Sequence, residues 1–170
     1  MDLMTHVQTM SAYNRWMNER LYEACARLPD ARRREDLGAF FKSIHGTLNH
    51  LLLADRVWLG RFTGVPFRVS SLDQQLYADF ADLRSERQRT DAAIAAWVAT
   101  LTPAHFAGEL AYTGITNPQP RRMPFWLAVV HLFNHQTHHR GQLTTLLKQS
   151  GIDPGVTDLI AMPAPQEQGP

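Results

Sequence analysis

The residues best suited to chemistry are histidines gathered in one stretch of the chain. Eight histidines occur in 170 residues, and four of them fall between positions 131 and 139. His135 and His139 are four residues apart, which places both side chains on one face of an α-helix, one turn from each other. Two imidazoles at this spacing bind one metal ion in helical zinc sites. His135 with His138, three residues apart, is also geometrically possible, so the spacing alone leaves the second ligand open.

These histidines interrupt a stripe that would otherwise be apolar. The stripe follows the helical period and is polar only in its middle: Ala128, Leu132, His135, His139, Gln142 and Leu146. An unpaired polar group in a protein core costs about 1–3 kcal/mol. The imidazoles therefore need partners, which are either a metal ion or one another, as a polar layer that fixes the register of the helices.

A third imidazole comes from a separate helical stripe, formed by Thr47, His50, Ala54 and Val57. If this face meets the first one, three histidines surround one ion and leave a position for water or substrate, as in catalytic zinc sites. Neutral imidazole suits Zn, Ni, Fe, Co or Cu and does not suit Ca or Mg. We interpret His131, His138 and Gln142 as neighbours that orient a ligand or the substrate.

Four long segments carry the helical period that positions these residues: 3–28, 36–62, 71–101 and 124–149. Ser71 and Gln74 form a capping-box pattern at the start of the third segment, and Pro124 suits the first position of the fourth. The pattern predicts an all-α fold, a four-helix bundle. Residues 106–123 read as a loop or short hairpin between the third and fourth helices, and residues 152–170 as a loop-like tail.

Composition limits the classes of function. A chain of 170 residues suits a single domain, residues 1–170. The formal net charge of +1 provides no strong field for nucleic acid or an anionic membrane, and we interpret the basic run Arg32–Arg34 as a solvated loop. One cysteine, Cys25, cannot form an internal disulfide. No secretory signal is visible and no apolar run is long enough to cross a bilayer, so we expect a cytoplasmic protein with neither nucleic-acid nor membrane partners.

Around the histidines the chain resembles the DinB/YfiT-like superfamily of metalloenzymes. The resemblance covers most of the chain and is most specific in the segment 134–142, which contains Asn134, His135, His138, His139, Arg140, Gly141 and Gln142. The segment 47–58, from Thr47 through His50 to Trp58, is similar to the family's second helix, and 13–21 to its first. Gly151 to Pro154 also fits the family pattern after the last helix.

The resemblance implies a fold, a ligand set and an assembly. It implies an up-down-down-up four-helix bundle with a long crossover between the second and third helices. The three family ligands map onto His50, His135 and His139, which favours His139 over His138, and the implied metal is a divalent transition ion such as Zn, Ni, Fe or Mn. Homodimers are common in the family, so a homodimer is expected.

Three functions are open at this point. The first is a metal-dependent enzyme, a hydrolase or a transferase, since some relatives resemble transferases that attach a low-molecular-weight thiol, such as bacillithiol, mycothiol or glutathione, to an electrophile. A metal with an open position can act as a Lewis acid or hold a thiolate. The second is a non-catalytic metal-binding protein of a stress response, and the third is a metal-free polar layer. Cys25 is interpreted as a packed core residue rather than a nucleophile.

Overall fold

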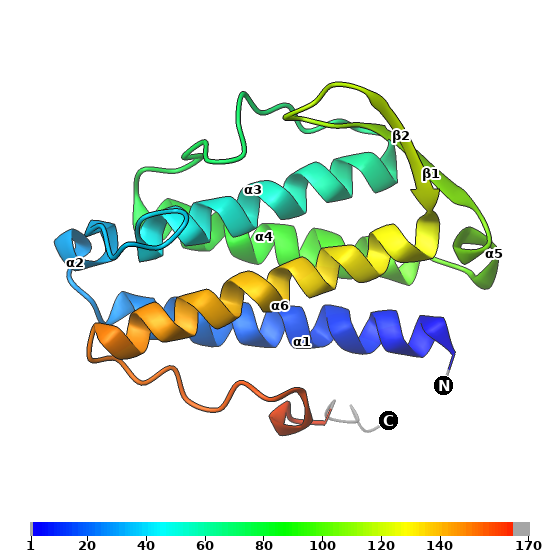
Figure 1. Cartoon of the computed structure of the whole chain (residues 1–170). Helices are drawn as coiled ribbons and strands as arrows, with labels where there is room; N and C mark the ends of the chain where they lie inside the picture. The colour runs from blue at the N-terminus through cyan, green and yellow to red at the C-terminus, as the bar shows by residue number, and fades with distance from the viewer. Residues whose placement is uncertain (1, 165–170) are drawn as a thin grey trace.

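The computed structural model describes residues 2–164 and is mostly helical. Four long helices lie side by side (Figure 1): α1 (Leu3–Ala26), α3 (Ile44–Thr63), α4 (Phe80–Ala99) and α6 (Phe125–Gln149). Helices α1 and α3 each pack against both α4 and α6. Figure 1 shows that α1 and α6 run in one direction and that α3 and α4 run in the other. None of the helices among residues 2–164 is both long and apolar enough to cross a membrane.

Shorter elements lie between the long helices: α2 (Asp30–Arg34), α5 (Pro103–Phe106), β1 (Glu109–Thr113) and β2 (Pro120–Pro124). The 3₁₀ helix η1 (Leu159–Ala161) follows α6. The strands pair antiparallel, so of the loop or short hairpin predicted before the last helix, the structure contains the hairpin. It contacts α3 and α6. The basic run does not form a loop as predicted, because Arg32 to Arg34 lie in α2, where Arg33 and Arg34 both pair with Asp30.

The second helix begins later than predicted. It starts at Ile44 rather than near residue 36, because Ser43 is its N-cap and accepts a hydrogen bond from the Gly46 N–H at 3.0 Å. Gly38 and Lys42 before it have φ angles of 72° and 64°, which a helix cannot contain. Phe40, which lies within the predicted helix but before the observed one, is 84% exposed.

The third helix also begins later, at Phe80, so the capping box predicted at Ser71 is wrong. Asp79 caps the helix and accepts from the N–H groups of Ala81 and Asp82 at 2.7 and 3.0 Å. Gln74 instead accepts from the Ser70 N–H at 2.8 Å, within an irregular segment. Residues 64–79 therefore cross between α3 and α4 without forming a helix.

A layer of buried charge crosses the helix core. Arg87 of α4 contacts Asp55 of α3 at 2.7 Å and Asp91 at 2.8 Å, and its side chain is only 2% exposed. Gln136 of α6 donates to Asp55, and Asn18 of α1 donates to Asp91 at 3.0 Å. Apolar clusters lie on both sides of this layer. All four long helices are thus joined by one polar network.

Candidate metal centre

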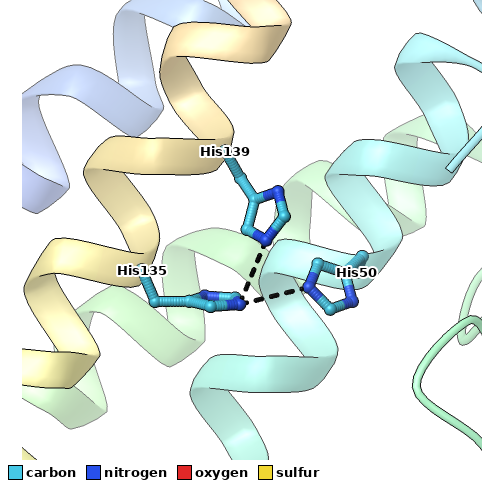
Figure 2. A group of neighbouring side chains, drawn as sticks. All are labelled: His50, His135 and His139. Carbon is cyan, nitrogen blue, oxygen red and sulfur yellow. Dashed lines mark hydrogen bonds between the residues drawn. The ribbon is translucent and has the colours of Figure 1, made fainter. Parts of the chain in front are cut away.

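Three histidines from two helices meet at one point. His50 of α3 and the pair His135 and His139 of α6 point toward one another (Figure 2). The Nε2 atom of His135 lies 3.3 Å from that of His50 and 3.1 Å from that of His139. Each residue offers a ligand atom within 4.8 Å of those of the other two. The three histidines are therefore close enough to bind a single metal ion.

In the His50 and His139 rings, a hydrogen bond at Nδ1 determines that Nε2 carries no proton. The Nδ1 atom of His50 lies 2.9 Å from the Leu72 carbonyl oxygen, and that of His139 lies 2.8 Å from Oε1 of Gln142. Both partners are acceptors, so each Nδ1 carries the proton and donates it. Each Nε2 then presents a bare lone pair to the centre of the cluster, as a metal ligand must.

The spacing of the nitrogens fits a metal better than it fits a hydrogen-bonded layer. Ligands at the usual Zn–N length in a tetrahedral site lie roughly 3.3 Å apart, close to the 3.1 and 3.3 Å found here. Without a cation, the Nε2 of His135 faces the lone pairs of two other nitrogens, those of His50 and His139, and can offer at most one proton to them. Its Nδ1 is buried and has no hydrogen-bond partner among the described residues. The donor set therefore fits a divalent transition metal.

The surroundings keep the rings uncharged. Burial lowers the pKa of His50 to about 4 and that of His135 to about 3. Burial also lowers the pKa of His139. All three imidazoles are neutral near pH 7, which is the form that binds a metal.

An aromatic ring holds the cluster from the side. Phe41, in the irregular segment before α3, stacks on the His50 ring with centroids 3.7 Å apart and planes at 16°. The centroid of the Phe41 ring also lies 5.5 Å from that of the His139 ring, with the planes at 64°. This contact was not predicted, because residues 36–43 were expected to be helical.

The other predicted site residues lie around the cluster rather than in it. Gln142 contacts His139 and also lies 3.3 Å from Nε2 of the exposed His138. His138 is not among the three converging rings. His131 lies one turn before His135, with its ring 4.9 Å from that of Trp58.

Two cavities are lined by histidines of the cluster, and both also reach Leu72, Ile115 and Thr116. The first, which we call the hairpin cavity, has a volume of about 500 Å³ and is lined by His50 and His135 together with side chains of α3, α6 and the β-hairpin. The second, the loop cavity, has a volume of about 950 Å³ and is lined by His50, His139 and the irregular segments 40–41 and 70–73. Both volumes suit small molecules.

Several residues that line the hairpin cavity were not predicted from the sequence. Arg61, Tyr112 and Arg121 line it. A signal for Arg61 was present, since the stripe through His50 and Val57 reaches Arg61 when it is continued by one more turn. The hairpin residues carried no such signal, because their place over the site depends on how the hairpin packs.

Comparison with known proteins places the chain in a family. The sequence matches the DinB family over residues 3–169. Protein DinB of Bacillus subtilis (strain 168) is 24% identical over 149 residues, which cover 86% of this chain and 87% of that protein. The crystal structure of a DinB-like protein from Bacillus cereus ATCC 10987 has a TM-score of 0.61 and 22% identity, covering 82% of this chain and 90% of that one. At this identity the structural likeness shows the fold alone.

Proposed function

The chain belongs to the DinB family, as the motifs around its histidines predicted, and on this premise we propose that it is a metal-dependent enzyme that transfers a low-molecular-weight thiol to an electrophilic substrate. One observation carries the proposal: the three histidines that could hold one metal ion line two cavities of a size that suits small molecules. We also propose that the four long helices form an up-down-down-up bundle and that the protein is a homodimer.

In this proposal the chain's own residues bind and orient. His50, His135 and His139 would hold the metal, while the Leu72 carbonyl and Gln142 fix the orientation of the His50 and His139 rings. The chemistry supplied by a divalent metal at this site would be to lower the pKa of a thiol bound to it. In the reaction the thiol would give its proton to solvent and its sulfur would form a bond to the electrophilic carbon, while the bond from that carbon to its leaving group breaks and the leaving group departs with the electron pair.

The two cavities support a reaction between two substrates. His50 lines both cavities, while His135 lines the hairpin cavity and His139 the loop cavity. Two small molecules, one in each cavity, would both lie against His50. A binding protein for one metal ion has no need for two such cavities.

A second candidate is a non-catalytic metal-binding protein of a stress response. The lining of the cavities favours it, because Asp73 is the only carboxylate among their described residues and no cysteine is present. The side chains thus offer little for acid–base or covalent catalysis beyond the metal ligands themselves.

Cobalt substitution separates the two functions. Tag-free protein loaded with Co²⁺ is titrated with a panel of small thiols, and product formation with a chromogenic alkylating agent is then followed. We expect a thiolate-to-cobalt absorption band and metal-dependent turnover, both lost in His135→Ala and retained in His105→Ala, which changes an exposed histidine of α5. One equivalent of bound metal with no spectral response to any thiol would favour the second candidate.

A further inference from the structure

The hairpin cavity beside the histidines is positively charged and has no acidic residue. Its lining contains two arginines, Arg61 and Arg121, and no aspartate or glutamate. The rest of the lining is aromatic, aliphatic or small and polar, apart from the imidazoles of His50, His131 and His135. An unbalanced pair of cations in a concave, partly apolar site concentrates the field on whatever enters it.

Arg61 is held in place by aromatic rings, and no carboxylate in the described part of the chain is paired with it. Its guanidinium carbon lies 4.4 Å from the ring centroids of both Trp58 and Tyr112. Its guanidinium donates a long hydrogen bond, 3.4 Å, to the Thr113 carbonyl oxygen. No carboxylate among residues 2–164 forms an ion pair with it. Burial lowers the pKa of Arg61, and nearby Arg121 lowers it further.

The hairpin brings Arg121 to the same cavity and turns its neighbour away. Arg121 is paired directly across the two strands with Tyr112, so both side chains lie on one face of the hairpin. The next residue, Arg122, faces the other way, is 75% exposed and lies 3.7 Å from Glu109. Arg122 thus has a carboxylate partner, whereas no carboxylate among the described residues pairs with Arg121.

We propose that the hairpin cavity binds a small organic carboxylate as one of the two substrates, with its anionic end on Arg61 and Arg121 and its reacting end at His50 and His135. Guanidinium groups match carboxylates in shape and bind them through paired hydrogen bonds. Trp58 and Tyr112 flank the carbon skeleton and keep the Arg61 guanidinium in position. This assignment rests on the proposed function, because it names the substrate class of the same site.

The first test measures anion binding without metal. Metal-free protein is titrated calorimetrically with 3-phenylpropionate and with the uncharged 3-phenylpropionamide, which has a similar shape. We expect the carboxylate to bind at least about tenfold more tightly, since hydrogen bonds to charged groups are the strong ones. Equal affinity for the acid and the amide, or binding of neither, would overturn the assignment.

Matched arginine variants localise the effect. Arg121→Gln and Arg61→Gln should each bring the ratio of the two affinities close to one, whereas Arg122→Gln, the same change on the outer face of the strand, should leave it unchanged. If Arg122→Gln reduces the ratio as much as Arg121→Gln does, the anion responds to overall charge and the assignment fails. Arg121→Gln carries the test even if Arg61→Gln disturbs packing, because Arg121 is exposed on its strand.

The second test asks which substrate carries the carboxylate and separates this inference from the proposed function. Co²⁺-loaded protein is titrated with 3-mercaptopropionate and 3-mercaptopropionamide. A lower Kd for the acid, with a thiolate-to-cobalt band, assigns the carboxylate to the thiol. An equal response to both thiols, with 3-phenylpropionate binding alongside them, assigns it to the electrophile. A thiolate band combined with no preference for any carboxylate would refute the carboxylate assignment and leave the proposed function standing. Carboxylate binding by protein that takes up no metal would refute the proposed function and leave carboxylate binding in the cavity standing.

Discussion

At the scale of single residues, His135 is the centre of the histidine cluster. Its Nε2 is the atom that lies 3.3 Å from His50 and 3.1 Å from His139. We therefore expect His135→Ala to reduce bound metal from near one equivalent to near zero, as measured by elemental analysis after dialysis. His131→Ala removes an imidazole one turn earlier on the same helix and should leave the stoichiometry unchanged. Equal loss in both variants would show that the histidines bind metal without a defined site.

The same residues predict how acid affects the metal-free fold. An unfolded histidine takes up a proton near pH 6.5, whereas the pKa is about 4 for His50 and about 3 for His135 in the folded protein. Between these values the unfolded chain binds more protons, so these residues lower the free energy of unfolding as pH falls from about 6.5 toward 4. Above about pH 7 their contribution is constant.

The test is the difference between two chains, because burial raises the pKa of Asp91 and acts in the opposite direction. Urea unfolding of metal-free wild type and His135→Gln is compared between about pH 7 and pH 4. The wild type should lose more stability than the variant over this range. A larger loss in the variant would contradict the neutral, buried state of His135.

At the scale of elements, two irregular segments complete the surroundings of the histidine cluster. Residues 36–43 bring Phe41 onto His50 with centroids 3.7 Å apart, and residues 64–79 bring the Leu72 carbonyl to the Nδ1 of His50. Phe41→Ala should weaken metal affinity about tenfold, the lower end of the range for groups that support metal ligands. Phe40→Ala, at an exposed neighbour, should have little effect when both are measured by competition with a chelator. Equal losses would mean that the stacking on His50 is not what supports the ring.

These segments also mark the limit of what the sequence predicted. The long helices and the histidine spacing on α6 follow from local periodicity, so they were predictable. It was not predictable whether Leu72 belongs to a helix. The apolar spacing around Leu72 fits a helix that begins at Ser71, but the N-cap of α4 is Asp79, eight residues later. A helix there would also have used the carbonyl that His50 needs. The meeting of His50 with His135 depends on helix packing, and only the family motifs suggested it in advance.

At the scale of the whole molecule, the buried network joins the helices that carry the histidines. Asp55 of α3 contacts both Arg87 of α4 and Gln136 of α6, the residue next to His135. Arg87→Met would leave two buried carboxylates without their cation and should lower the free energy of unfolding by about 3–5 kcal/mol. Arg89→Met, at an exposed position of the same helix, should change it by less than about 0.5 kcal/mol. Urea unfolding measures both, and a small effect of Arg87→Met would mean that water reaches the network.

Metal should add to this connection between helices, since its ligands come from α3 and α6. A ligand that binds only the folded state stabilises it by about 2.7 kcal/mol at a hundred times its Kd. Wild type should therefore melt at a higher temperature with Zn²⁺ than with a chelator, whereas His50→Ala should melt at the same temperature in both conditions. An equal shift in His50→Ala would place the stabilising metal elsewhere.

The most direct measurement is anomalous diffraction from crystals of the Zn²⁺-loaded protein, recorded on both sides of the metal absorption edge. We predict one strong anomalous peak about 2.0–2.1 Å from each of three Nε2 atoms, those of His50, His135 and His139. A peak bound to His138 or to any other set of side chains, or no peak at the cluster in fully loaded protein, would contradict the shared metal centre.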